Sequence, residues 1–246
     1  MGLIHVPNQE LYNPPGIIGW WKFDEASSGN CNIANSVLDY SGLNNNCTPT
    51  NNPTYQVGII GKGAIKFPTT GYLSTANVLP VNGKTLSVSF WINSDSVGST
   101  YTNEFIMELS QNANSYNGSF FIGYNVSSGG CYTYGTIQAT QKSTGWGVVS
   151  NKNRIDDGVS HHIVVTLDRS QVSFYNQYGI YLDGVIQTLY NNGTNNTIMS
   201  NNFTNYVLYI GNRYNSSLGL NRILDDIKIY NRILSQSEIT KLYTST

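Results

Sequence analysis

The chain has 246 residues, of which 11% are charged and 39% hydrophobic, and its formal net charge is −1. This length is sufficient for one large all-β domain or two small ones. The 13 Lys and Arg residues are scattered among 14 Asp and Glu, which excludes a basic patch for nucleic acid, and the apolar content excludes a disordered polar chain. No stretch approaches the roughly 18 apolar residues of a membrane-spanning helix, so no membrane insertion is predicted.

The N-terminal segment is predicted to be an extended arm (1–15) that precedes one folded domain (16–246). It contains Pro7, Pro14 and Pro15. Residues 1–16 have no basic segment followed by an apolar run, so no signal peptide is predicted. The arm has two interpretations, a linker or a strand that docks on neighbouring molecules, and both stay open.

From residue 16 onward, short β-rich runs alternate with turn signals. Residues 86–92 alternate polar and apolar side chains, which is typical of a half-buried strand. Further strands are predicted at 16–23, 64–67, 105–109, 120–124, 135–138, 147–149, 162–167, 172–175, 179–182, 206–211 and 225–230. Tight turns are predicted at Asn82-Gly83, Asp157-Gly158, Asp183-Gly184 and Asn192-Gly193. Many short antiparallel strands at this spacing predict a β-sandwich or barrel.

One short helix is predicted at the C-terminus. Ser235-Gln236-Ser237-Glu238 has the pattern of a capping box, in which the Ser hydroxyl and the Glu carboxylate satisfy backbone N–H groups at the start of the helix. Leu234 and Ile239 flank this first turn and are predicted to pack together as a hydrophobic staple.

Cysteines and glycosylation sequons bear on the compartment. Cys31 and Cys47 flank a Ser/Asn/Gly-rich loop, and a disulfide between them would stabilise the fold by roughly 3 kcal/mol on the chain-entropy model. Such a bond fits an oxidising environment, while buried free thiols are the alternative. Seven Asn-x-Ser/Thr sequons favour an outward-facing glycoprotein, although a chain with 32 Asn produces some by chance: Asn46, Asn117, Asn125, Asn192, Asn195, Asn202 and Asn215.

A series of motifs occurs in order between residues 16 and 245. They are Gly19-Trp20-Trp21-Lys22-Phe23-Asp24-Glu25, Asp39-Tyr40-Ser41-Gly42, residues 57–67, residues 86–92, His161-His162-Ile163-Val164, Tyr181-Leu182-Asp183-Gly184, and residues 208–212 and 223–234. Together they resemble laminin G-like (LamG-like) domains of the concanavalin A-like lectin/glucanase superfamily. The resemblance implies an all-β, concanavalin A-like jelly-roll β-sandwich of two antiparallel sheets with one short C-terminal helix. Residues 97–150 match the family least, although ligand specificity usually lies in such variable loops.

The informative acidic residues are concentrated towards the two ends of the chain. A jelly roll pairs its first and last strands, so these distant positions should meet. Calcium takes about six to eight oxygen ligands from carboxylates, amides and turn carbonyls. Asp24, Asp39, Asn45 and Asp225 are therefore predicted to hold a structural Ca²⁺, as the resemblance also implies, with Asp226 facing the opposite way. Turn capping, or pairing with Lys and Arg, is the alternative.

Catalysis has one candidate pair. Glu104 and Glu108 are predicted on one face of a strand, a pattern similar to the paired acids of retaining glucanases of this fold. Ile106 stands where the glucanase motif has Asp, and about 13 Å along a strand exceeds the separation that retaining chemistry requires. Both are interpreted as solvent-facing, and a glycoside hydrolase is the least favoured hypothesis. His161 and His162 are neighbours on a strand, so they diverge and cannot share a metal.

Aromatic and amide side chains are interleaved between residues 97 and 150, and the aromatic ones are the predicted ligand-binding residues: Tyr101, Tyr116, Tyr124, Tyr132, Tyr134 and Trp146. Sugar rings stack on aromatic side chains and their hydroxyls need neutral donors and acceptors, while protein interfaces use the same composition. The sequence thus predicts a non-catalytic, extracellular or cell-surface module that binds a glycan or a surface protein. The alternative is a structural or attachment component of an extracellular assembly or virion surface, oligomerising or docking through its N-terminal arm.

Overall fold

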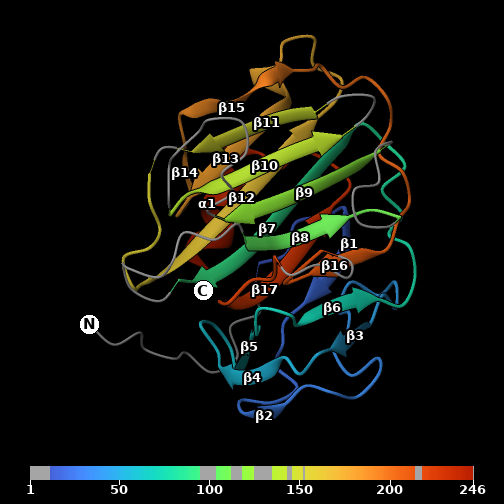
Figure 1. Ribbon diagram of the computed structural model, residues 1–246, viewed down its shortest axis with the longest axis vertical. Coiled ribbons are helices and arrows are strands. Elements are labelled where there is room, and N and C mark those ends of the chain that lie inside the picture. The colour runs from blue at the N-terminus through green and yellow to red at the C-terminus, as the bar shows by residue number, and fades with distance from the viewer. Residues whose placement is uncertain are drawn as a thin grey trace.

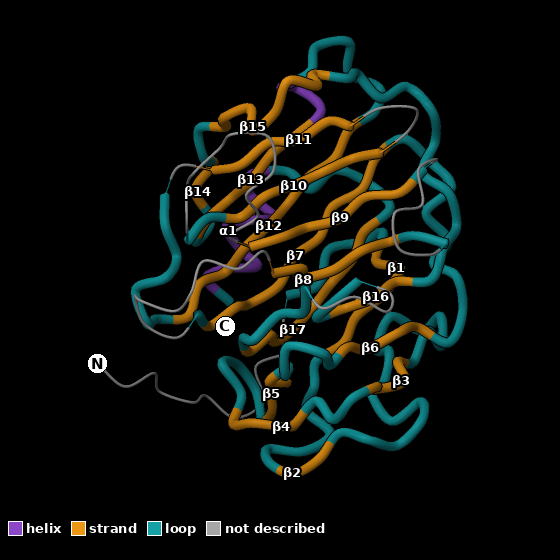
Figure 2. Tube along the Cα trace, viewed as in Figure 1, coloured by secondary structure: helices purple, strands orange, loops and turns teal. Residues whose placement is uncertain are grey.

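The strands form two antiparallel sheets that lie one behind the other in Figures 1 and 2. The computed structural model describes residues 12–94, 104–111, 118–124, 135–142, 146–151, 153–213 and 218–245. With one short helix at the C-terminal end, the predicted all-β, concanavalin A-like jelly-roll sandwich is confirmed.

One sheet has nine strands within the described residues. Its order is β14 (Val185–Ile186), β13 (Tyr178–Leu182), β12 (Ser160–Asp168), β7 (Thr85–Asn93), β17 (Ile223–Tyr230), β5 (Gly63–Lys66), β4 (Thr54–Val57) and β2 (Gly29–Asn30), with β1 (Ile17–Trp21) also paired to β17. Trp20 lies opposite Lys228 and Trp21 opposite Ile227, so the first and last long strands meet as predicted.

The other sheet has eight strands within the described residues. Its order is β15 (Leu189–Asn196), β11 (Trp146–Asn151), β10 (Ile137–Lys142), β9 (Ser119–Tyr124), β8 (Glu104–Leu109), β16 (Leu208–Ile210), β6 (Tyr72–Thr75) and β3 (Cys47–Thr50). A β-bulge lies in β8, where the register against β9 shifts between Phe105 and Met107. Ile106 is the extra residue.

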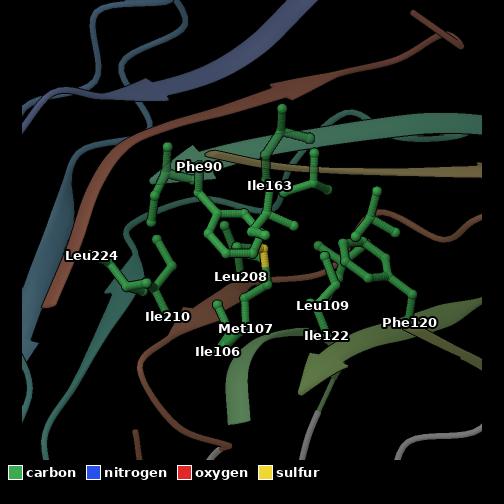
Figure 3. Close-up of a cluster of buried hydrophobic side chains, with 14 of the residues drawn as sticks. Phe90, Ile106, Met107, Leu109, Phe120, Ile122, Ile163, Leu208, Ile210 and Leu224 are labelled. Atoms are coloured by element: carbon green, nitrogen blue, oxygen red, sulfur yellow. The ribbon is translucent and has the colours of Figure 1, made fainter. Parts of the chain in front are cut away.

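The hydrophobic core fills the space between the two sheets. Side chains from both sheets point toward one another there, including Phe90, Ile163 and Leu224 from the nine-stranded sheet and Met107, Phe120, Ile122 and Ile210 from the eight-stranded sheet (Figure 3). Because side chains alternate along a strand, the residues between these core positions face outward from each sheet. Each sheet therefore has an inner face in the core and an outer face.

Helix α1 (Gln236–Thr244) covers part of the outer face of the nine-stranded sheet. Ser235 is its N-cap, and the capping box with Glu238 is present as predicted. Leu234 and Ile239 share a second buried cluster with Val164 and Tyr230, which confirms that the staple residues pack together. Of the predicted arm, residues 1–11 lie outside the described residues. Tyr12 packs against this same cluster.

Two local predictions are wrong. Residues 172–175 do not form a strand, because the Asp168 carboxylate accepts a hydrogen bond from the backbone N–H of Ser170 at 2.9 Å and the chain turns there, leading into the 3₁₀ helix η1 (Tyr175–Gln177). Asn192-Gly193 is not a hairpin turn, because it lies inside β15 opposite a register shift in β11.

The two described cysteines are separate buried thiols. Cys31 and Cys47 form no disulfide with each other, which corrects that prediction in favour of its alternative. Cys31 lies beside the side chains of Tyr55 and Ser36, and the Cys47 thiol faces the carbonyl of Asn45 at 4.0 Å. Burial raises the pKa of both thiols. Cys131 lies outside the described residues.

Candidate binding face

The three predicted calcium-binding carboxylates, those of Asp24, Asp39 and Asp225, serve as acceptors for backbone N–H groups, while the side-chain amide of Asn45 donates to the Ile18 carbonyl at 3.3 Å. Asp225 is fully buried, and its Oδ2 accepts from the backbone N–H of Ile59 and Ile60 at 2.8 and 2.9 Å. Asp24 Oδ1 accepts from the N–H groups of Lys62 and Gly63 at 2.5 and 3.0 Å. The two carboxylates therefore hold the loop between β4 and β5.

Asp39 is also saturated with donors. Its Oδ1 accepts from the backbone N–H of Trp20 and Ser41, both at 2.9 Å, and its Oδ2 accepts from the Ser41 hydroxyl and the N–H of Asn45, both at 2.8 Å. In the described part of the chain no group of three or more His, Cys, Asp or Glu side chains is placed to hold a metal ion. As arranged, these residues do not fit an oxygen cage for calcium, and a structural Ca²⁺ stays a prediction that the geometry does not support.

Asp226 has a different role from its neighbour. Its backbone has a φ of 44° at a register shift in β17, and its carboxylate accepts from Trp20 Nε1 at 2.6 Å and pairs with the buried Lys228 ammonium. It therefore corresponds to the ion-pairing alternative of the sequence analysis.

The bulge in β8 separates the two candidate catalytic glutamates. Glu104 lies opposite Tyr124, whose ring is in the core, whereas Glu108 lies opposite Phe121 on the outer face. One extra residue shifts the alternation by one, so the prediction that both share a face is wrong. The prediction that they face solvent is also wrong, because Glu104 is 4% exposed and Glu108 is 1% exposed.

Each glutamate has a buried arginine partner. Glu104 pairs with Arg222 at 3.1 Å and accepts from the backbone N–H of Asn221 at 3.1 Å, while burial raises its pKa. Glu108 forms a bidentate pair with Arg213, whose Nε and Nη2 donate to its two oxygens at 3.0 Å each. The two carboxylates thus lie on different faces and are engaged with different cations.

The outer face of the eight-stranded sheet carries an aromatic pair beside this bidentate pair. The Phe105 and Phe121 rings lie 5.0 Å apart. The Arg213 guanidinium lies 4.5 Å from the Phe105 centroid and 5.3 Å from the Phe121 centroid, so cation–π attraction adds to the ion pair. Glu108 cancels the charge of Arg213, and the centre of this face combines apolar rings with little net charge.

Two polar side chains of β10 continue the same face. Gln138 and Thr140 alternate with the core residues Ile137 and Ala139. Gln138 lies opposite Gly123 of β9, and Thr140 lies opposite Phe121. Gln138 is 1% exposed and Thr140 is 0% exposed. Neither the amide atoms of Gln138 nor the hydroxyl of Thr140 has a hydrogen-bond partner. We call Phe105, Phe121, Gln138 and Thr140, with the Glu108–Arg213 pair, the outer-face cluster.

The structure places only one of the predicted aromatic ligand-binding side chains. Tyr124 is 1% exposed and belongs to the hydrophobic core, and burial raises its pKa to about 12. This prediction is wrong because Tyr124 follows the alternation of β9 and points into the core with Phe120 and Ile122. Tyr101, Tyr116, Tyr132 and Tyr134 lie outside the described residues, and Trp146 is described only as part of the β11 backbone.

The predicted glycosylation sites stay predictions. Asn202 is exposed, while Asn46 is half-buried and its Oδ1 accepts from the backbone N–H of Asp39 at 2.8 Å. Asn192 and Asn195 are part of the β15 backbone. Asn117, Asn125 and Asn215 lie outside the described residues.

The two histidines diverge, as predicted. His161 Nδ1 lies 2.8 Å from Asp183 Oδ2 and its Nε2 lies 3.1 Å from Asp157 Oδ1. The hydrogen bond to Asp183 is the main reason why the pKa of His161 is raised. His162 faces Ser89 at 2.9 Å beneath α1, and burial lowers its pKa to about 4.

Sequence reasoning missed Arg213 and Thr140, whereas Gln138 is one of the amide side chains interleaved with the aromatic residues of 97–150. The alternation of polar and apolar residues from Ile137 to Thr140 was a usable signal for a strand with a polar outer face. No sequence signal showed that this polar face is itself buried, because that depends on the tertiary structure around it.

The two antiparallel sheets define a concanavalin A-like jelly-roll domain. Residues 67–240 match the family model of the concanavalin A-like lectin/glucanases superfamily. The match covers more than half of the chain, so the chain belongs to this superfamily, which confirms the resemblance. No curated protein matches the sequence. The described residues include no helix with the length and apolar content needed to cross a membrane.

Solved structures with the same fold come from an arabinanase and from toxins. Domain 4 of AbnA, a GH43 extracellular arabinanase from Geobacillus stearothermophilus, in complex with arabinotriose, has a TM-score of 0.65 at 18% identity and covers 93% of this chain and 98% of that domain. The binding domain of botulinum neurotoxin DC, in complex with rat synaptotagmin II, has a TM-score of 0.64 at 15% identity, over 94% of this chain and 51% of the toxin chain. The binding domain of Paraclostridial Mosquitocidal Protein 1 has a TM-score of 0.66 at 14% identity, and the match covers 94% of this chain and 52% of that chain.

The chain thus spans about half the length of the toxin binding domains. At these identities the likeness shows the fold alone.

Proposed function

We propose that this chain is a non-catalytic recognition module that binds carbohydrate through the outer-face cluster of its eight-stranded sheet. One observation carries the proposal: this face places the Phe105 and Phe121 rings beside the neutral amide of Gln138 and the hydroxyl of Thr140. The four residues are at most 4% exposed, so the proposal requires that they become accessible when a sugar binds. Sugars present apolar C–H faces and uncharged hydroxyls, which are the complements of these two kinds of group.

We also propose that the domain does not hydrolyse the carbohydrate that it binds. A glycosidase needs two carboxyl groups that flank one glycosidic bond, one of them able to donate a proton. Glu104 and Glu108 lie on different faces of β8, and each is paired with an arginine. This arrangement supports binding in preference to hydrolysis.

The comparisons support the same class of function. The arabinanase domain of similar fold is in complex with arabinotriose and comes from an extracellular enzyme. We therefore propose a secreted or surface location for this chain too. A protein partner is the second candidate function, because the toxin binding domain of similar fold is in complex with rat synaptotagmin II.

A glycan array that includes arabinotriose tests the proposal. The wild-type protein is expected to bind one class of glycan, with EDTA causing no loss. Phe121→Leu is expected to weaken that binding, whereas Tyr175→Ala, which removes a 45% exposed aromatic ring from η1, is expected to leave it unchanged. An empty array would contradict the carbohydrate proposal and favour the protein partner. Release of reducing sugar would contradict the non-catalytic role.

A further inference from the structure

We propose that Trp20, Lys22 and Tyr40 form a second recognition site, which takes an acidic side chain that a partner protein presents beside an apolar one. We call these three residues the Lys22 site. The inference goes beyond the proposed function, because this site belongs to the other sheet and does not depend on what the outer-face cluster binds.

The Lys22 ammonium lies against two aromatic rings. Its Nζ is 4.3 Å from the centroid of the Trp20 ring and 4.6 Å from that of the Tyr40 ring. The two rings are 6.3 Å apart in an edge-to-face arrangement. Cation–π attraction favours this position of the ammonium, but the rings supply no oxygen acceptor for its three N–H donors.

Within the described residues, Lys22 forms no ion pair and its ammonium donates no hydrogen bond. Lys228 differs in this respect. Its Nζ lies 5.0 Å from the same Trp20 ring, but it pairs with the Asp226 carboxylate, and both of these residues are buried. Lys22 is only half-buried, so of these two lysines it is the one that can receive an anionic group from another molecule.

Exposed apolar side chains lie on the turn that carries Tyr40. Three of them fall within residues 38–43 and are between 40% and 47% exposed: Leu38, Tyr40 and Leu43. Protein interfaces combine aromatic and other apolar side chains with a small number of paired charges. An acidic residue of a partner would satisfy the Lys22 ammonium while an adjacent apolar residue covers part of this turn.

This turn is held in one shape by its own hydrogen bonds. The Asp39 carboxylate accepts four of them, including one from the Trp20 backbone N–H at 2.9 Å. The Tyr40 N–H donates to the Trp20 carbonyl at 2.7 Å, and the Ser41 hydroxyl accepts from the Leu43 N–H at 3.3 Å. Trp20 and Tyr40 therefore keep their relative positions, and a preorganised site loses less conformational entropy when it binds.

The charges around the site favour one acidic side chain over a polyanion. Burial raises the pKa of the Tyr40 phenol, and the nearby Glu25 and Asp24 carboxylates add to this effect. The same carboxylates would repel a sulfated glycan or an anionic membrane, and a membrane of this kind is bound by clusters of several basic residues. A single carboxylate at Lys22 meets less of this repulsion, and the aliphatic side chains of the turn complement apolar residues of a protein.

The Lys22 site and the outer-face cluster lie on opposite sides of the sandwich. Trp21 packs in the core between the sheets, so Trp20, its neighbour on β1, faces outward from the nine-stranded sheet. A glycan bound to the eight-stranded sheet would leave the Lys22 site open. The domain is thereby able to bind a glycan and a protein at the same time.

The experiment is a selection of random peptides by phage display on the whole chain, followed by fluorescence anisotropy with the synthetic peptide that is enriched most. We expect the enriched peptides to contain Asp or Glu next to Leu, Ile or Phe. Lys22→Gln is expected to weaken binding of this peptide about tenfold, whereas Lys22→Arg keeps the charge and is expected to retain most of the affinity. Added salt should weaken binding to the wild-type protein more than binding to Lys22→Gln.

Two pairs of variants separate this site from the rest of the surface. Tyr40→Ala is expected to weaken peptide binding, whereas Tyr175→Ala, which removes a ring of similar exposure on η1, is expected to leave it unchanged. Lys84→Gln, at an exposed lysine just before β7, is the matched control for Lys22→Gln and is also expected to have no effect.

Several results would overturn the inference. They are a selection that enriches no peptide or peptides without acidic residues, unchanged peptide binding by both Lys22→Gln and Tyr40→Ala, and an equal loss of binding in the two control variants. Stronger binding to heparin, or to vesicles of phosphatidylcholine and phosphatidylserine, than to the peptide would assign the site to a polyanion and overturn the protein partner. Lys22→Gln is expected to leave binding on the glycan array unchanged, so each of these results would leave the proposed function intact.

Discussion

The buried Glu108–Arg213 pair gives the sharpest test of how the outer-face cluster is held together. Glu108→Leu removes the carboxylate and leaves the Arg213 guanidinium buried over the Phe105 ring at 4.5 Å. Because the Glu108 side chain is 1% exposed and that of Arg213 is 10% exposed, water cannot readily replace the lost partner. Breaking a buried pair in this way is expected to lower the free energy of unfolding by about 3–5 kcal/mol.

The double variant separates charge from packing. Glu108→Leu with Arg213→Met removes both charges and keeps apolar volume against Phe105 and Phe121. Replacing a whole buried pair with apolar side chains is often close to neutral, so the double variant is expected to be more stable than either single variant. Urea denaturation of the four proteins gives the coupling energy directly.

The Arg232–Glu238 pair near α1 is the control. Its Nη2 and Oε1 atoms are 2.7 Å apart, but the two side chains are 31% and 19% exposed. Glu238→Gln is therefore expected to cost only about 0.5–1 kcal/mol. The reasoning would be refuted if Glu108→Leu lowered the free energy of unfolding by less than about 1 kcal/mol. It would also be refuted if the double variant lost as much free energy of unfolding as the two single variants together.

Three further measurements test other contacts. The pKa of His161 is raised by its hydrogen bond to Asp183. This contact therefore stabilises the fold fully below about pH 6.5 and less as the pH rises through the folded-state pKa. His161→Gln should flatten that part of the profile of melting temperature against pH, and an unchanged profile would contradict the assignment. EDTA should leave the melting temperature unchanged while Asp225→Ala costs about 3 kcal/mol through orphaned N–H groups; a fall with EDTA would instead support the calcium prediction. Ser235→Ala should cost about 1 kcal/mol in urea denaturation, and no change would contradict the capping box.

Much of the fold follows from local patterns in the sequence. The alternation in residues 86–92 predicts the strand β7, although this strand is buried on both faces and not half-buried as predicted. The Ser235 to Glu238 spacing predicts the start of α1. Both elements are decided by neighbouring residues. The seam between β1 and β17 follows from family motifs instead. Errors arise where side-chain hydrogen bonds compete with the strand pattern. The strand predicted at 172–175 is absent because the Asp168 carboxylate accepts a hydrogen bond from the backbone N–H of Ser170 and the chain turns there.

The site was harder to predict, because it depends on register. A single extra residue in β8, Ile106, places Glu104 and Glu108 on opposite faces, and no local pattern marks that bulge. The acids at the seam were located correctly, but their partners are backbone N–H groups of a distant loop, which have no signature in the sequence.

Burial of the outer face is likewise a tertiary property. Gln138 and Thr140 look like solvent-facing strand residues when the sequence is read alone, and only the structure shows them to be buried without partners.

The most direct test of the central claim is a titration of the isotopically labelled protein with a glycan that it binds, followed by NMR of the backbone amides. The account predicts that the amides of Gly123, Gln138 and Thr140 shift in proportion to bound glycan, while those of α1 do not. Shifts confined to the seam around Asp24 and Asp225, with β9 and β10 unchanged, would contradict the assignment of the binding site to the outer face of the eight-stranded sheet.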